Sequence, residues 1–136
     1  MTGGLVAFGD AVLLAPLVSV AALPTALLVG LGGALGALGR YAVDVMLGGG
    51  RRSTFAVNVL GSFALGALVA SSPADATLAV AGTGFCGAFT TFSSFAVNVV
   101  RAVDAGDSRL AVVDAAGTLA SALFGVGAGW ATVGIL

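Results

Sequence analysis

The chain has 136 residues, of which 59% are hydrophobic and 8% are charged, and its net charge is −1. A soluble domain of this length carries charge on roughly a quarter of its residues, so this composition excludes a water-soluble protein and predicts a single-domain integral membrane protein. Histidine is absent and Cys86 is the one cysteine, which excludes a histidine-based metal centre and an internal disulfide, and without a basic run we expect no nucleic-acid partner.

Residues 1–22 are predicted to be an N-terminal extension that lies at the membrane interface or lengthens the first helix. The run between Asp10 and Pro24 is shorter than the roughly 20 apolar residues that a helix needs to cross a bilayer. The opening "MTGGLVAFGD" has no positive charge, so we do not expect a secretory signal.

Apolar runs of spanning length predict an all-α protein with four transmembrane helices, which together form one domain over residues 23–136. The charged and turn-forming stretches "GGGRRS" (residues 48–53), "SSPAD" and "DAGDS" separate these runs. The predicted spans are residues 23–47, 54–70, 76–100 and 109–135.

Small residues recur at a spacing of four in the first and fourth spans. The first span has Gly32 and Gly36, with Arg40 and Asp44 continuing the spacing, and the fourth places Gly117, Ser121, Gly125 and Gly129 in the same way. Because small residues allow helices in lipid to approach closely, these ladders predict a tight helix bundle that associates further.

The third span is predicted to be broken near its middle. Gly82, Gly84 and Gly87 weaken a helix strongly, and hydroxyl side chains follow them directly. Non-helical backbone at membrane depth survives only where it is buried in protein or lines a cavity. We therefore expect a break over residues 87–90, with carbonyl groups freed to bind a cation or each other.

Two groups of polar and aromatic residues each admit two interpretations. Arg40 either forms an ion pair with Asp44, one turn later, or attracts an anion. Phe92 and Phe95 share a helix face, and they either pack against lipid and protein or turn their positive ring edges toward an anion. Hydroxyl groups and the Asn58 amide would donate hydrogen bonds to the same ion.

Three motifs resemble those of the Fluc (CrcB) family of fluoride channels. They are "GGALGALGRY" (Gly32 to Tyr41), "TFAVNVLGSFALG" (Thr54 to Gly66) and "GFCGAFTTFSSF" (Gly84 to Phe95), of which the third is the most specific. The resemblance covers most of residues 30–98 and reaches the fourth span only through its small residues.

The resemblance implies antiparallel dimers with two fluoride pores and a structural sodium ion at the dimer interface. It also implies passive export of fluoride across the plasma membrane, and no enzyme activity. The fluoride pathway would comprise Asn58, Phe92, Phe95, Ser93, Ser94 and Ser121. The backbone carbonyls of Gly87 and Thr90 would hold the sodium ion, and Arg40 would attract anions electrostatically.

Charge distribution predicts the orientation of the chain and the nature of its partner. The loops at residues 48–53 and 101–109 hold four arginines, while the second loop and both tails hold none. This bias predicts that both loops face the cytoplasm.

The same bias predicts the partner. In an antiparallel homodimer the chain must insert in both orientations, which requires nearly equal positive charge on its two sides. We therefore expect an antiparallel dimer with a homologous subunit of opposite bias. That subunit would also supply groups missing here, since Ala96 and Asn98 stand where family members often have Ser and Glu.

The sequence is also compatible with two other functions. A four-helix proton-coupled multidrug exporter would need a membrane-embedded glutamate, and the chain contains none, although Asp44 or Asp114 would be substitutes. A structural membrane subunit would tolerate substitution of Asn58 and Phe92. An enzyme is not expected, because no nucleophile and base are paired and no two carboxylates are placed for acid–base work.

Overall fold

The computed structural model describes residues 23–135, and the regular elements of this part are all helices. They are α2 (Leu23–Leu47), α3 (Gly50–Ala70), α4 (Asp75–Thr77), the π-helix η1 (Leu78–Cys86), α5 (Gly87–Phe89), α6 (Phe92–Asp104) and α7 (Ser108–Gly134). Four stretches are long and apolar enough to cross a membrane: Pro24–Leu47, Gly50–Ala70, Asp75–Asp104 and Ser108–Gly134. The predicted all-α architecture with four spans is therefore confirmed. The prediction for residues 1–22 lies outside the described residues.

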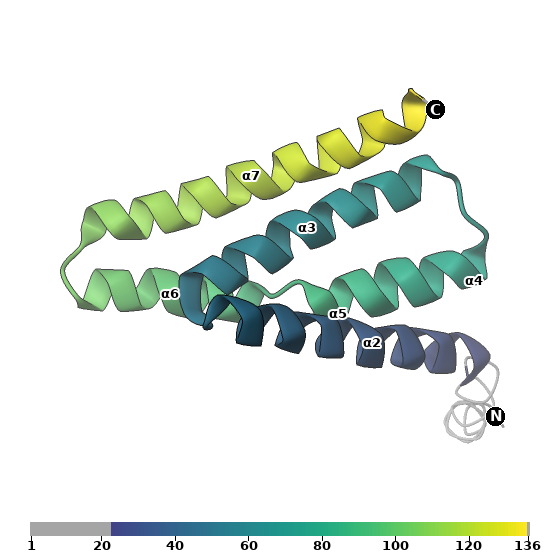
Figure 1. Cartoon of the computed structure of the whole chain (residues 1–136), viewed down its shortest axis with the longest axis horizontal. Helices are drawn as coiled ribbons and strands as arrows, with labels where there is room; N and C mark the ends of the chain where they lie inside the picture. Colours follow the sequence, from purple (N-terminus) through teal and green to yellow (C-terminus); the bar gives the residue numbers. More distant parts are fainter. Residues whose placement is uncertain (1–22, 136) are drawn as a thin grey trace, which may run out of the picture.

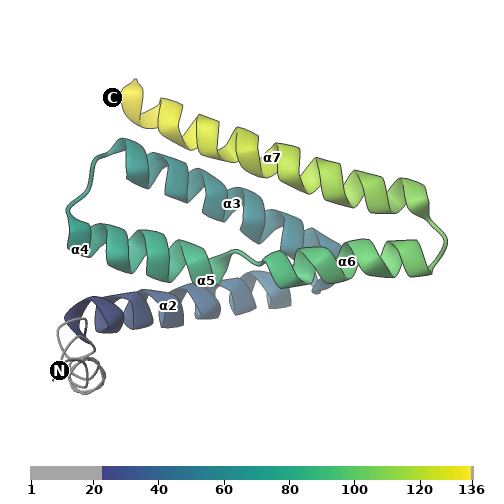
Figure 2. The ribbon, with the colours of Figure 1, turned by 180° about the vertical axis from the view of Figure 1, so that it is seen from behind.

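The four spans run back and forth, so the helix connections gather at two ends of the molecule (Figure 1). The turn between α6 and α7 lies at one end, and the turn between α2 and α3 lies on the same side but is set in from it, as the reverse view also shows (Figure 2). The connection between α3 and α4 lies at the other end, near the C-terminal end of α7. Because α3 and α7 both begin at the first end, their amino termini point the same way. We call this end, which carries the turns 48–49 and 105–107, the arginine end.

The turn between α2 and α3 depends on glycine and on Asp44. Gly48 and Gly49 have φ values of 73° and 71°, which only glycine adopts at little cost. The Gly49 N–H donates to the Asp44 carbonyl oxygen at 2.8 Å, and the Ser53 hydroxyl donates to the Asp44 carboxylate. Asp44 therefore ties the end of α2 to the first turn of α3.

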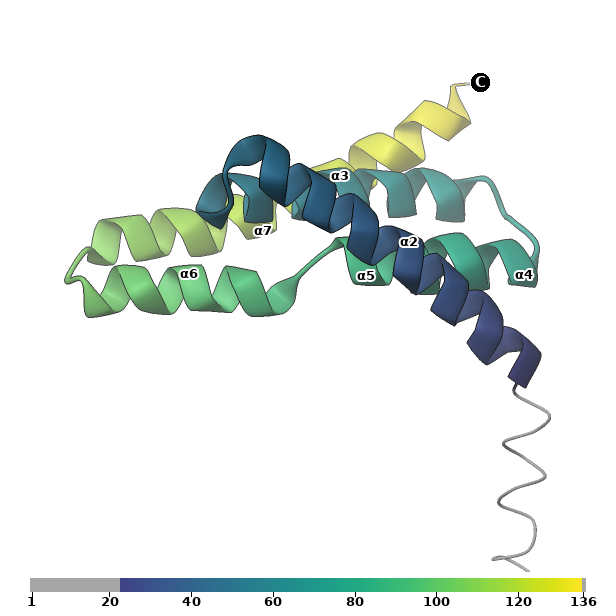
Figure 3. The same cartoon turned by 60° about the horizontal axis from the view of Figure 1, so that its bottom comes forward.

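Glycines bring α2 into backbone contact with η1, which α2 crosses obliquely (Figure 3). A Cβ atom on Gly32 would overlap the carbonyl oxygen of Val80, and one on Gly36 would overlap that of Phe85. The two glycines of the first ladder thus serve close helix packing, as the sequence predicted.

The fourth-span ladder serves the same purpose against α3, but over only part of its length. A Cβ atom on Gly129 would overlap the carbonyl oxygen of Phe63, and one on Gly125 would lie 3.0 Å from that of Val59. Gly117 has open space where its Cβ would be. Close packing of α7 on α3 is therefore confirmed at Gly125 and Gly129 and not at Gly117.

Helical backbone in the third segment stops after Phe89 and resumes at Phe92. Thr90 (φ −77°, ψ 163°) and Thr91 (φ −150°, ψ 115°) are extended. The preceding glycines remain helical: Gly82 and Gly84 lie within η1 and Gly87 opens α5. The extended residues therefore follow the glycine cluster, at the two threonines, and lie within the stretch Asp75–Asp104.

Most large apolar side chains of the described residues face outward. Leu35, Met46 and Phe124 are exposed, whereas Val57 is the largest side chain that is fully buried. An apolar surface of this extent is typical of a protein that lies in lipid.

Candidate functional site

The side chain of Asn58, in the middle of α3, holds the extended segment between α5 and α6. Its Oδ1 accepts the backbone N–H of Thr91 at 2.8 Å, and its Nδ2 donates to the Thr91 carbonyl oxygen at 3.1 Å. Only this orientation of the amide satisfies both the N–H and the carbonyl oxygen of Thr91. In the flipped orientation the amide NH₂ would face the Thr91 N–H, and the amide oxygen would face the Thr91 carbonyl oxygen. One of the two N–H groups on Nδ2 is not needed for these bonds.

Thr91 in turn caps the amino terminus of α6. Its Oγ1 accepts the backbone N–H of Ser94 at 3.2 Å and lies 3.2 Å from the Ser94 hydroxyl, to which it donates. Thr91 itself is buried. The amino terminus of α6, which carries a partial positive charge, is thereby fixed in the interior of the third span.

Two carbonyl groups lose the donors that a continuous helix would give them. The Gly87 and Thr90 oxygens would normally accept the N–H groups of Thr91 and Ser94, four residues on. Here the Thr91 N–H bonds to Asn58 and the Ser94 N–H bonds to the Thr91 hydroxyl. Among residues 23–135, neither carbonyl oxygen receives a hydrogen bond from another group. Both oxygens are therefore able to coordinate a cation.

A groove of about 370 Å³ opens beside this segment, between α3, η1, the start of α6 and α7. We call it the phenylalanine groove, since Phe92 and Phe95 line it together with Asn58. The centroids of the two rings are 5.7 Å apart and their planes are tilted by 47°. Four residues with hydroxyl side chains also line this groove: Ser62, Thr90, Thr91 and Thr118.

A second groove of about 370 Å³ leads on toward the arginine end. Phe95 and Thr118 line both grooves, so the two adjoin. We call the second one the outer groove, and its polar lining is Arg51, Arg52, Thr54, Asn98, Asp114, Thr118 and Ser121. Donor groups therefore follow one another from the centre of the third span to the start of α3.

A third cavity, of about 470 Å³, lies between α2, α3 and α6. It is lined by Arg40, Ser93 and Ser94, together with Asp44 and the hydroxyls of Ser53 and Thr54. Because Phe92 and Phe95 share one face of α6, Ser93 and Ser94 fall on another. The structure thus divides the predicted site residues between two sides of α6, with Thr91 lining both the third cavity and the phenylalanine groove.

The alternative in which Arg40 pairs with Asp44 is wrong. In the described residues the one ion pair joins Arg51 to Asp114. The Asp44 carboxylate instead accepts a hydrogen bond from Ser53. Both Arg40 and Asp44 line the third cavity, where the guanidinium of Arg40 makes no hydrogen bond with the described residues.

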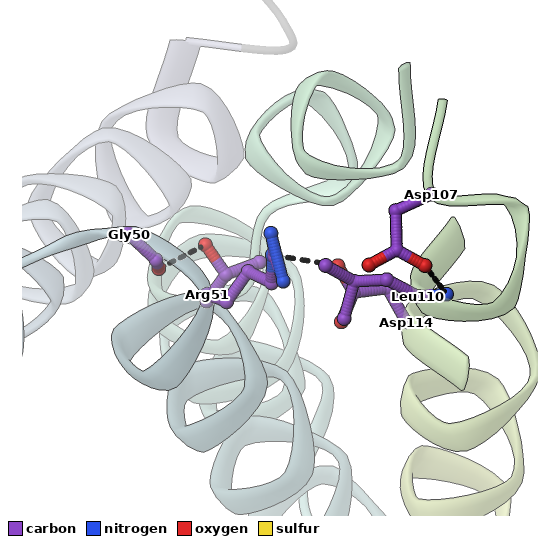
Figure 4. Close-up of polar contacts among 6 residues, drawn as sticks. Gly50, Arg51, Asp107, Leu110 and Asp114 are labelled. Atoms are coloured by element: carbon purple, nitrogen blue, oxygen red, sulfur yellow. Dashed lines mark hydrogen bonds and ion pairs between the residues drawn. The ribbon is translucent and has the colours of Figure 1, made fainter. Parts of the chain in front are cut away.

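Arg51 and Asp114 connect α3 and α7 at the outer groove (Figure 4). Arg51 lies in the first turn of α3, and its Nε is 2.9 Å from Oδ2 of Asp114. The side chain of Arg51 is 43% exposed and that of Asp114 is 17% exposed. Although the contact is short, Asp114 Oδ2 has no partner with hydrogen-bond geometry among the described residues. The pair is therefore an electrostatic contact rather than an aligned hydrogen bond.

The family model described as "CrcB-like protein, Camphor Resistance (CrcB)" matches residues 27–130. The chain belongs to the CrcB-like family. It is 50% identical over 121 residues to "Fluoride-specific ion channel FluC 2" of Haloarcula marismortui, an alignment that covers 85% of this chain and 98% of the relative. It is 49% identical over 105 residues to the protein of the same name from Natronomonas pharaonis, with 77% and 90% covered. The Rhodococcus jostii "Fluoride-specific ion channel FluC 2" is 42% identical over 109 residues, with 78% and 93% covered.

Sequence reasoning about this CrcB-like chain missed three site residues. Thr91 lies within the third motif, where the sequence does not distinguish it from the neighbouring hydroxyl residues, whereas in the structure its backbone and side chain organise the start of α6. Thr118 links the two grooves, and Asp114 neutralises part of the outer groove. The spacing of Thr118 three residues before Ser121, on the same helix face, was a signal for the first of these links.

Proposed function

We propose that this CrcB-like chain is a subunit of a fluoride-selective channel that exports fluoride passively and so lowers its concentration in the cytoplasm. The observation that carries this proposal is the grouping of Asn58, Phe92 and Phe95 in one groove of a chain whose relatives are named fluoride-specific ion channels. Transport of this kind needs no catalytic residue.

The groove chemistry supports conduction of a small, dehydrated anion. Removing an anion from water costs tens of kcal/mol in a low dielectric, so closely spaced donors must replace the lost hydration. The second N–H of Asn58 is one such donor, and α7 carries two more toward the arginine end: Ser121 and, three residues closer to that end, Thr118. The edges of the Phe92 and Phe95 rings carry partial positive charge and would complete the coordination.

Arg40, Ser93 and Ser94 have a separate role in this proposal. They line the cavity beside the amino terminus of α6, where the guanidinium, the hydroxyl donors and the helix dipole favour an anion. Asp44 also lines this cavity, and its carboxylate accepts a hydrogen bond from Ser53. We infer that this cavity is a vestibule in which fluoride collects, and that Ser93 and Ser94 belong to its walls.

A structural sodium ion fits the carbonyl groups of Gly87 and Thr90. Carbonyl oxygens are suitable ligands for a hard cation, and both of these lack their helical donors. A break of this kind at membrane depth would be stabilised by the ion in addition to Asn58. Sodium bound there would join this subunit to its partner.

We propose further that the partner is a homologous subunit in the opposite orientation, so that the two form an antiparallel dimer. Phe92 is 79% exposed, although it lines the groove, and a partner helix would cover it. The arginines at residues 51, 52, 101 and 109 favour an orientation in the plasma membrane with the arginine end in the cytoplasm. A partner with the opposite charge bias would insert the other way.

The proton-coupled exporter is the less well supported alternative. Asp114 contacts Arg51, and Asp44 accepts a hydrogen bond from Ser53 in the turn at the arginine end. Neither carboxylate therefore stands alone in the middle of a span, as a proton-coupling site requires. A purely structural subunit would not need the donors that line the grooves.

Fluoride efflux from liposomes, followed with a fluoride-selective electrode, tests the function. The chain is reconstituted alone and together with its nearest homologous subunit, and chloride efflux serves as the control. We expect rapid efflux of fluoride and not of chloride when both subunits are present. Efflux from this chain alone would preserve the channel and contradict the heterodimer, while the absence of efflux from both preparations would contradict the channel.

A further inference from the structure

The contact between Arg51 and Asp114 stands where the outer groove reaches the arginine end. Both side chains line that groove, together with Arg52, Asn98 and the hydroxyls of Thr118 and Ser121. Asp114 is a negative charge in a path suggested for an anion, so its presence needs a physical reason. The fluoride pathway inferred from the sequence contains neither residue.

The geometry of the pair leaves most of the guanidinium unused. Arg51 contacts Asp114 through Nε, at 2.9 Å, and its side chain extends from α3 toward α7 (Figure 4). A guanidinium carries five N–H groups in a fixed planar arrangement, of which Nε supplies one. The terminal NH₂ groups make no hydrogen bond with the rest of residues 23–135. They are therefore available to an anion in the groove.

The charged side chains that line the outer groove have a net positive charge, which favours an anion. Arg51, Arg52 and Asp114 are the charged groups that line the outer groove. With Asp114 ionised, the lining keeps one net positive charge, which attracts an anion without the strong binding expected of two arginines. Without Arg51, Arg52 would be the remaining positive charge of the lining, and the half-buried carboxylate would repel an anion within the groove.

We propose that Arg51 is an anion-contacting residue at the arginine end of the conduction path and that Asp114 is its positioning residue. Asp114 holds Arg51 by Nε, so that the terminal NH₂ groups face the groove, and it limits how tightly the mouth binds an anion. Gly125 and Gly129 fix the α3–α7 spacing by backbone contact farther along α7, whereas Gly117, the ladder glycine nearest Asp114, makes no such contact. The inference rests on the proposed channel function.

Charge-removing variants test the pair in the reconstituted preparation that conducts fluoride. We expect Arg51→Gln to lower fluoride efflux on the order of tenfold, because the carboxylate then repels the ion. Asp114→Asn should lower the half-saturating fluoride concentration several-fold, because the mouth gains a net positive charge. The double variant should conduct several-fold faster than Arg51→Gln, because the repelling carboxylate is gone. Arg101→Gln is the control, since this exposed arginine also lies near the arginine end but does not line the groove.

Thermal unfolding and the dimer fraction in detergent are measured for the same variants. They separate a role of Arg51 and Asp114 in conduction from a purely structural contact between α3 and α7. A double variant that is as inactive as Arg51→Gln would overturn the inference. Wild-type efflux with unchanged fluoride dependence in Arg51→Gln, Asp114→Asn and the double variant would also overturn it. Arg51→Lys covers the case in which Arg51→Gln fails to assemble. Because an ammonium group cannot hold Asp114 and an anion in the same fixed arrangement, we expect several-fold slower efflux, and wild-type kinetics would overturn the inference. A wild-type preparation without fluoride efflux would instead contradict the proposed function.

Discussion

Asn58 and Thr91, which are 33 residues apart in the sequence, are joined by two hydrogen bonds that use both polar atoms of the asparagine amide. The amide thus satisfies the backbone of Thr91 where the third segment is extended. The same side chain lines the phenylalanine groove with one N–H to spare. Asn58 therefore holds the backbone of Thr91 and also has a donor available for an ion in the groove.

Two substitutions of Asn58 test these roles. Asn58→Ala removes both hydrogen bonds, so we expect fluoride efflux to be lost and the free energy of unfolding to fall by about 1–3 kcal/mol. Asn58→Asp keeps an acceptor for the Thr91 N–H, but its second oxygen cannot donate and would face the Thr91 carbonyl oxygen, so we expect it to be as inactive as Asn58→Ala and no more stable. Efflux and thermal unfolding in detergent are measured together, with Asn98→Ala as the stability control. Wild-type efflux from Asn58→Asp would contradict donation to the ion.

The contribution of the aromatic edges can be tested at Phe92. Phe92→Leu keeps an apolar side chain but removes the ring, so we expect fluoride efflux to fall on the order of tenfold, since anion–edge contacts are lost. Phe124→Leu is a matched control, because both phenylalanines are 79% exposed and only Phe92 lines the groove. An equal loss in the two variants would indicate general packing rather than ion contact.

Close packing of α2 on η1 predicts different effects for two glycines on the same helix. Gly36→Ala should lower the free energy of unfolding by about 1–3 kcal/mol, because its Cβ would overlap the Phe85 carbonyl oxygen. In Gly30→Ala the new Cβ atom would have open space around it. This variant should therefore leave the free energy of unfolding unchanged or raise it by up to about 1 kcal/mol. Thermal unfolding in detergent compares the two, and equal midpoints would contradict the packing described for α2.

The α3–α7 contact has its own matched pair of glycines. Gly129→Ala should loosen α7, since its Cβ would overlap the Phe63 carbonyl oxygen, whereas Gly127→Ala has open space. Trp130 is the only tryptophan of the chain and lies beside Gly129 on α7, so its fluorescence reports this contact. We expect a shifted emission maximum and a lower unfolding midpoint for Gly129→Ala alone. Unchanged emission and stability in that variant would count against close approach of the two helices.

Removal of sodium tests the proposed role of the Gly87 and Thr90 carbonyls. Prolonged dialysis against N-methylglucamine should reduce the dimer fraction and fluoride efflux, because neither carbonyl has another donor among the described residues. Return of sodium should restore both, and the same dialysis with sodium present is the control. A dimer fraction and an efflux rate that do not depend on sodium would contradict a structural ion.

The spans and the most specific motif could be predicted from the sequence, because apolar run length and local spacing depend on neighbouring residues. Residues 23–47 were predicted as the first span and form α2 as predicted, and Gly32 and Gly36 pack closely as their spacing indicated. Phe92 and Phe95 lie on one face, as three-residue spacing requires.

The relationships that required the structure join residues far apart in the chain. Thr91 meets Asn58 from a different span, and no local pattern indicates that bond. Asp44 accepts from Ser53 across a turn rather than pairing with Arg40 on its own helix, because the glycine turn brings the serine hydroxyl to it. Ser93 and Ser94 belong to a different cavity from Phe92, which follows only when the neighbours of α6 are known.

The most direct test of the account is the reversal potential of currents across a planar bilayer that separates a high-fluoride, low-chloride solution from a low-fluoride, high-chloride solution. The preparation contains this chain alone or with its homologous subunit, whichever conducts in liposomes. We predict a reversal potential close to the fluoride equilibrium potential, because the donors along the two grooves suit a small dehydrated anion. A reversal potential set by chloride, or no anion current from either preparation, would contradict the account.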